Sequence, residues 1–232
     1  MTLQEKKFLP ELAVYLFSTA KQTGGKAPSE RELAEHFSVS RGQVREALAI
    51  LEAMQVIERR AKSGIYLLPE NLGIETMAFY ARAGIDLDPA QVFEAVEVRR
   101  IHETSAAELA AERATDENLE KLRNILDRSE ARIDAGKGLA ELDHEFHLEV
   151  VRATQNSVFH KIYRSFYALS EPRLKLYFNT VERSRKSHVE HCQIFDALTA
   201  RDGRLAKALM NSHLSGAASY WSEILETPQD QG

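Results

Sequence analysis

The sequence contains a single cysteine and no long apolar run. Cys192 alone cannot form an internal disulfide framework, and it is explained most simply as a small buried apolar side chain. No stretch is long enough to span a membrane, and the N-terminus lacks the apolar segment of a signal peptide. These absences predict a cytoplasmic protein that does not enter a membrane.

A strong excess of charge of either sign is also missing. Residues 1–70 hold 10 Lys and Arg against 9 Asp and Glu, and the rest of the chain holds 20 against 26. Any affinity for DNA must therefore come from a local basic face and a second copy of it, because one weakly charged domain makes few phosphate contacts. The length of 232 residues, 44% of them hydrophobic, allows two domains.

Two helix starts in tandem are the clearest local feature of residues 28–67. Ser29-x-x-Glu32 follows a proline, and Ser40-x-x-Gln43 repeats the pattern further along the chain. Each motif pairs a side-chain acceptor with the unpaired amides at the start of a helix. Such motifs also occur singly on ordinary surface helices, but the tandem order predicts two short helices separated by a turn.

The second of these helices has one apolar and one basic face. Arg41 and Arg45 are four residues apart and share a face, and the opposite stripe is made of Val44, Ala47, Leu48 and Leu51. Two short strands are expected next, Gln55–Arg60 and Ile65–Leu68, around a turn that contains Gly64. A helix of this kind fits the major groove of double-stranded DNA, and the whole pattern predicts a winged helix-turn-helix.

Residues 28–64 resemble the GntR family of bacterial regulators. The similarity lies in PSERELA at 28–34, VSR at 39–41, VREAL at 44–48 and the basic wing that ends at Gly64. The resemblance implies that Arg31, Arg41 and Arg45 hold phosphates and base edges, with backbone-level contacts at Ser40 and Gly64. The chain departs from the family pattern after the expected first helix, Leu9–Lys21, because Thr23–Lys26 lacks the usual strand entry.

After about residue 70 the pattern becomes entirely helical. Helical periods are expected at 74–83, 89–113, 116–135, 139–154, 157–178, 183–200 and 203–225. Short loops between them predict an antiparallel all-α bundle. The expected fold is mainly α, with a winged helix-turn-helix domain at 1–70, a linker at Pro69–Leu72 and a helical effector- and metal-binding domain at 71–232.

Seven of the eight histidines lie after residue 100. Asp143 and His147 are four apart and share a helix face with apolar residues, while His191 and His213 lie on two further helices. One aspartate and three histidines suit a divalent transition metal and leave open positions for water or a carboxylate. Spacing alone leaves a second interpretation open, because an isolated Asp-His pair is more often a hydrogen bond in the core.

The bundle resembles the FCD ligand-binding domain of the FadR branch of the same family. The motifs that carry this similarity are Glu97-Val98-Arg99 with Glu103, Asp143-x-x-x-His147, Asn156, His191-x-x-Ile194 and His213-Leu214 after Asp202-Gly203. The resemblance implies that Asp143, His147, His191 and His213 bind zinc, nickel or manganese.

Two further residues are implied in effector binding. By the resemblance, Arg99 holds the carboxylate of a small effector, although it could instead pair with Glu103 on its own helix. Asn156 lines the pocket or only caps a helix. His188 is a possible substitute ligand, and helical geometry predicts that His144 faces outward.

These features predict a homodimeric transcriptional regulator that binds a near-palindromic operator. The resemblance implies repression that is relieved when a small organic acid binds at the metal centre. Two alternatives remain: a metalloregulator that responds to the ion itself, and a metal-dependent hydrolase or isomerase. The enzyme is disfavoured, because no carboxylate beyond the ligands is placed by a motif as a general base.

Overall fold

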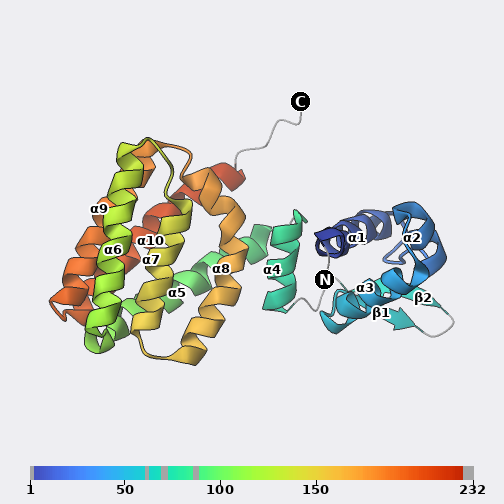
Figure 1. Cartoon of the computed structure of the whole chain (residues 1–232), viewed down its shortest axis with the longest axis horizontal. Helices are drawn as coiled ribbons and strands as arrows, with labels where there is room; N and C mark the ends of the chain where they lie inside the picture. Colours follow the sequence, from blue (N-terminus) through green and yellow to red (C-terminus); the bar gives the residue numbers. More distant parts are fainter. Residues whose placement is uncertain (1–2, 61–62, 69–72, 86–88, 227–232) are drawn as a thin grey trace. The chain divides into compact units, whose positions relative to one another are not determined.

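The computed structural model describes residues 3–60, 63–68, 73–85 and 89–226. The chain folds into two compact units, Met1–Leu87 and Asp88–Gly232. Figure 1 shows helices and a hairpin in the first unit, and a bundle of long helices in the second. The mainly helical fold expected from the sequence is confirmed.

The first three helices form the helix-turn-helix and its support. They are α1 (Leu3–Gln22), α2 (Glu30–Phe37) and α3 (Arg41–Ala53). The amide of Glu32 donates to Ser29 Oγ at 3.4 Å, and the amide of Gln43 donates to Ser40 Oγ at 3.2 Å. Both capping boxes are complete, so α2 and α3 begin at the positions that the motifs predicted.

Apolar side chains from all three helices form the core of the first unit. The fully buried members include Leu12, Leu16, Leu33, Leu48 and Leu51. Helix α1 starts at Leu3 rather than at the expected Leu9. Its first turns could not be predicted, because the polar run 4–7 carries no apolar periodicity. The buried stripe of α3 leaves its opposite face in solvent.

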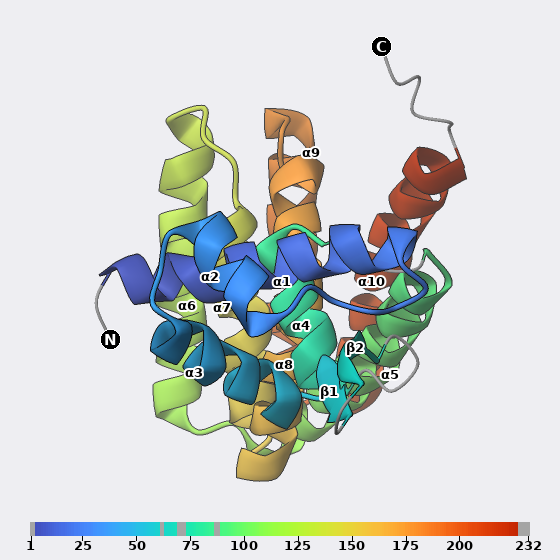
Figure 2. The same ribbon diagram turned by 90° about the vertical axis from the view of Figure 1, so that its right-hand side faces the viewer.

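The wing is a two-stranded antiparallel hairpin of β1 (Ile57–Arg60) and β2 (Gly64–Leu67). It lies beside α3, as Figure 2 also shows. Strand β1 begins later than expected because Gln55 has a left-handed φ of 59°, which a strand cannot contain. Lys26 forms an isolated antiparallel bridge with Tyr66, so the entry after α1 touches the hairpin at one residue pair but forms no strand.

Helix α4 (Ile74–Ala83) completes the first unit. Phe79 and Tyr80 belong to the same apolar core as α1, and the Tyr80 ring meets Phe17 edge-on at 5.5 Å between centroids. The domain boundary expected at residue 70 precedes this helix, whereas the boundary between the two compact units follows it. The expected linker, Pro69–Leu72, lies outside the described residues.

In its described range, 89–226, the second unit is a bundle of six helices joined by short turns. They are α5 (Pro89–Arg113), α6 (Asp116–Asp134), α7 (Ala140–Ala153), α8 (Ser157–Tyr177), α9 (Val181–Thr199) and α10 (Gly203–Glu226). Helix α5 contacts α7, α8, α9 and α10. Its buried alanines, Ala107, Ala110 and Ala111, have side chains small enough for α10 to pack closely against it. This central helix therefore brings the faces of α7, α9 and α10 towards one interior.

In the described ranges, no helix is both long and apolar enough to cross a bilayer.

Candidate metal centre and nucleic-acid interface

Four side chains with metal-ligating atoms meet inside the bundle. Asp143 and His147 come from α7, His191 from α9 and His213 from α10, and all four are buried. Their ligating atoms all lie within 4.8 Å of one another. The structure thus brings together the four residues that the sequence analysis named as ligands.

The three imidazoles point their Nε2 atoms at one another. The Nε2 atoms of His147 and His213 are 3.2 Å apart, and that of His191 lies 3.3 Å from His147 and 3.2 Å from His213. Asp143 Oδ1 lies 3.4 Å from the Nε2 of His191 and 3.7 Å from that of His147. Ligands that share one ion at about 2.0–2.1 Å have separations of this size.

The opposite ring nitrogens of two histidines face carboxylates. His147 Nδ1 contacts Glu103 Oε2 of α5, and His213 Nδ1 lies 2.7 Å from Glu190 Oε2 of α9. A carboxylate at Nδ1 holds the proton of a neutral imidazole there and leaves the Nε2 lone pair exposed. Lone pairs converging in this way repel one another unless a cation lies between them, so the residues fit a metal ion.

Charges around the cluster also favour a cation. Burial raises the pKa of Asp143, but His147, His191 and His213 together outweigh burial and lower that pKa below its usual range. Burial lowers the pKa of His147, but Glu103 and Asp143 raise it to about 9, so a metal ion that binds here displaces a proton from this ring. His191 keeps a pKa well below its usual value through burial and the neighbouring His213, so it is neutral and able to coordinate.

Arg99 lies beside the cluster but is already paired. Its Nε donates to Glu103 Oε1, and the two side chains are 12% and 1% exposed. Arg99 and His147 lower the pKa of Glu103 to about 2 against the effect of burial. The helix-face ion pair that the sequence left open is therefore present. It links Arg99 through Glu103 to the ligand His147.

The other histidines and Asn156 lie in different surroundings. Asn156 is exposed, and its Oδ1 accepts the amides of Val158 and Phe159 at 3.1 Å, so it caps α8. Its role in effector binding stays a prediction. His188 Nε2 lies 3.7 Å from Cys192 Sγ rather than in the cluster. His144, expected to face outward, is half-buried and stacks on Tyr167 with centroids 3.3 Å apart.

Sequence reasoning missed the carboxylates that orient the ligands. Glu103 was noticed only as a partner for Arg99, although the spacing of four between them does place it on the same inward face. Glu190 precedes His191 in the sequence, yet its contact is with His213 on another helix. Ser187 was also missed, and its Oγ donates to Asp143 Oδ1 at 3.3 Å. Contacts between helices leave no signal in sequence spacing.

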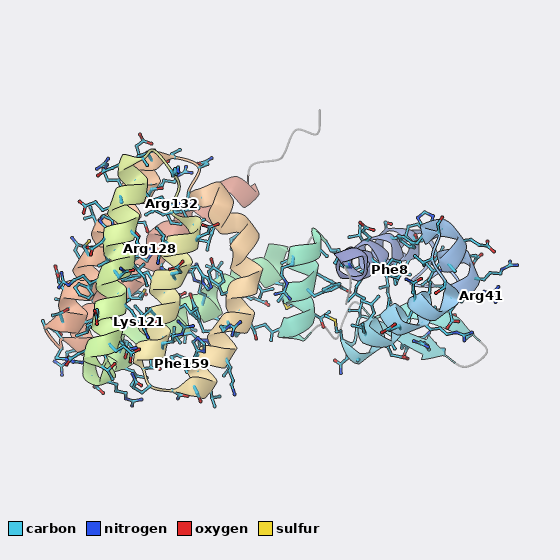
Figure 3. The ribbon with its side chains drawn as sticks, in the orientation of Figure 1. Phe8, Arg41, Lys121, Arg128, Arg132 and Phe159 are labelled. Carbon is cyan, nitrogen blue, oxygen red and sulfur yellow. The ribbon has the colours of Figure 1, made fainter. Side chains whose placement is uncertain are left out.

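The expected DNA-contacting residues lie on the exposed side of the first unit. Arg31, Arg41 and Arg45 are exposed, and Figure 3 shows the Arg41 side chain projecting away from the ribbon. Ser40 caps α3, and Gly64 opens β2 with a φ of 123°, a conformation that favours glycine. Thus α3 presents arginines at its start while the hairpin stands beside it.

A winged helix-turn-helix followed by a helical bundle with a buried histidine and carboxylate cluster defines a DNA-binding regulator. Residues 15–67 match the family model of bacterial regulatory proteins of the gntR family, and residues 94–216 match that of the FCD domain. The chain belongs to the GntR family, in the FadR-like subfamily with a C-terminal FCD domain.

Individual relatives agree with this assignment. The chain is 34% identical to the Uxu operon transcriptional regulator of Escherichia coli over 206 residues, which is 86% of this chain and 79% of that protein. It is 31% identical over 209 residues to the HTH-type transcriptional regulator LutR of Bacillus subtilis, covering 88% of this chain and 94% of LutR. These relatives are regulators, and the chain is a DNA-binding transcriptional regulator rather than a hydrolase or isomerase.

A solved structure shares the fold. The structure of Lar, which controls the expression of the Listeria monocytogenes agr system, superposes with a TM-score of 0.62 at 19% identity. The match covers 96% of this chain and 98% of that chain.

Proposed function

We propose that the protein is a homodimeric repressor whose hold on a near-palindromic operator is released by a small organic acid. Arg31, Arg41 and Arg45 would contact the operator, together with the backbone near Ser40 and Gly64. A dimer is needed because one unit with a nearly balanced charge makes few phosphate contacts. Binding to chromosomal DNA places the protein in the cytoplasm.

The observation that carries the effector proposal is the convergence of four ligating atoms next to a largely buried arginine. Asp143, His147, His191 and His213 would hold a zinc, nickel or manganese ion, which supplies a Lewis-acidic position for a carboxylate oxygen. Arg99 uses Nε for Glu103, and the Nη groups of a guanidinium can hold a second carboxylate. The effector's acid group would then lie between Arg99 and the ion, with Asn156 as a further contact.

Control of DNA binding requires only that two arrangements of the bundle differ in affinity for the acid and present the wings differently. Glu103 contacts both Arg99 and His147. An effector carboxylate that binds Arg99 would therefore also change the contact between Glu103 and the metal ligand His147. This connection supports a response that needs both the acid and the metal.

One observation favours a second candidate, a metalloregulator. The charge of Arg99 is matched by Glu103 within the protein, so Arg99 does not require an external acid to balance it. In that case the ion itself would be the signal.

Thermal melting of the metal-loaded protein against a panel of small carboxylates, repeated after chelation, distinguishes the two. A ligand at 100 times its Kd stabilises the folded state by about 2.7 kcal/mol, which for a chain of this size raises the melting temperature by about 5–10 °C. We expect one class of acid to give this shift only with metal present. Arg99→Lys, which keeps a charge for Glu103 but loses the planar fork, should remove the acid shift and leave the metal shift.

A large shift from metal with none from any acid would replace the organic-acid proposal with the metalloregulator. Equal shifts with and without metal would show that the acid does not bind at this centre.

A further inference from the structure

Glu30, the first residue of α2, lies between the recognition helix and the wing. Its Oε2 accepts from Arg45 Nε of α3 at 2.7 Å, and its Oε1 lies 4.0 Å from Arg59 Nη1 of β1. The Glu30 side chain is 29% exposed, whereas that of Arg45 is 64% exposed. One carboxylate therefore touches both elements that are expected to meet DNA.

Arg59 is itself held in place by the end of α3. Its Nε lies 3.2 Å from Glu52 Oε2, and its backbone amide donates to Glu52 Oε1 at 3.2 Å. Arg59 Nη2 also donates to the carbonyl oxygen of Arg45 at 3.3 Å. These contacts fix the wing strand to α3, so Glu30 and Arg45 belong to a connected polar network rather than to an isolated surface pair.

The contact with Glu30 determines which edge of the Arg45 guanidinium remains for another partner. Because Nε is engaged, the fork formed by Nη1 and Nη2 is left for end-on contact. That fork can donate two hydrogen bonds to the O6 and N7 acceptors of guanine. Arg41 differs, because the ion pairs found in the described part of the chain do not engage it.

We propose that Glu30 is a positioning residue that aims Arg45 at one base pair of each half-site and so sets the specificity of the operator contact. The inference rests on the proposed contact of Arg45 with a base. The recognised ligand is a G·C pair in the major groove, read through the end-on fork of Arg45.

A carboxylate at this place has two opposite effects on DNA binding. Its negative charge repels phosphates and weakens binding to any sequence. Its hydrogen bond limits the rotamers of Arg45 and so lowers the entropy lost when the guanidinium meets one base. Removing Glu30 should therefore strengthen binding to random DNA while weakening discrimination, a combination that simple damage to the fold does not produce.

The test is selection of binding sites from a randomised duplex pool by the full-length protein and four variants. The variants are Arg45→Ala, Glu30→Ala, Glu30→Gln and Glu35→Ala. Glu35 is the matched control, because it pairs with Arg31 at 3.9 Å and its removal deletes the same charge from the same helix. Affinity for a fixed random duplex and for the selected site is measured beside each selection, and melting confirms folding.

We expect Arg45→Ala and Glu30→Ala to lose preference at the same half-site position. Discrimination there should fall about tenfold in Glu30→Ala, the size of one lost bidentate contact, while affinity for random DNA rises about two- to fivefold. Glu30→Gln keeps an acceptor for Arg45 Nε and should keep most of the preference. Glu35→Ala should raise affinity for random DNA but leave that position unchanged.

An unchanged preference in Glu30→Ala, with a lost one in Arg45→Ala, would overturn the proposal and leave Arg45 as a base-contacting residue. An equal loss at every position would also overturn it, because Glu30 would then support the fold alone. No change in Arg45→Ala would overturn both this inference and the proposed role of Arg45.

Discussion

Among single residues, Glu103 joins Arg99 to a ligand of the candidate metal centre. One of its oxygens meets Arg99, and the other meets the Nδ1 of His147. Carboxylates in this position fix the orientation and tautomer of a histidine ligand and increase its basicity. The strength of metal binding should therefore depend on a residue that does not touch the ion.

We expect Glu103→Gln to weaken metal binding about 10- to 100-fold, because a neutral amide supports His147 less well than a carboxylate does. The measurement is a zinc titration in competition with a chromophoric chelator at fixed pH. Glu108→Gln is the matched control, since Glu108 lies on the same helix and pairs with Lys207 at 2.7 Å on the surface. Equal zinc affinities in both variants would contradict a role for Glu103. Circular dichroism confirms that both variants fold.

At the level of the elements, the turn between α6 and α7 packs directly against the end of α8. A Cβ placed on Gly138 would lie 2.5 Å from the carbonyl oxygen of Phe178, and Arg132 Nε donates to the Gly138 carbonyl oxygen at 2.7 Å. Only glycine fits at this approach. The turn thus fixes the start of α7, which carries Asp143 and His147.

Gly138→Ala should destabilise the bundle by about 1–3 kcal/mol through overpacking, and lower its melting temperature by about 3–10 °C. Gly216→Ala provides the contrast. Gly216 lies within α10, and the nearest atom to an added Cβ is Lys186 Nζ at 3.8 Å, so alanine should stabilise the helix by about 1 kcal/mol. Thermal melting of the two variants should shift in opposite directions; a shared direction would mean that the space around Gly138 can adjust.

The same elements show what can be read from the sequence. The starts of α2 and α3 were predictable because a capping box lies within four consecutive residues. Helix α9 begins at Val181, two residues before the expected position, because the side chain of Thr180 caps it there. The prediction missed this start because the neighbouring residues carry little apolar periodicity. The four ligands were named through the family resemblance. The contact of Glu190 with His213 depends on how α9 packs on α10, and no spacing in the sequence reports it.

In the whole molecule, the residues for the two proposed activities belong to separate units. Arg41 lies in the unit that ends at Leu87, and all four candidate ligands lie in the unit that begins at Asp88. Each unit has an apolar core of its own. Changes in one unit should therefore spare the local structure of the other.

We expect Arg41→Ala to abolish specific DNA binding at moderate salt while the zinc content stays at the wild-type level. His191→Ala should do the reverse, losing zinc while binding to a random duplex persists. Metal analysis and fluorescence anisotropy on the same preparations test both. Loss of zinc in Arg41→Ala, or of all DNA binding in His191→Ala, would show that the two units depend on each other for folding.

The order of the two units along the chain matters during protein synthesis. A ribosome completes the winged unit while the helices that carry His191 and His213 have yet to be made, and N-terminal units generally fold first. A nascent chain therefore presents its DNA-contacting arginines before the metal cluster can assemble. A stop codon anywhere between residues 88 and 213 would leave a chain that has the winged unit but lacks at least His213, so its DNA-contacting arginines would be present without a complete metal cluster.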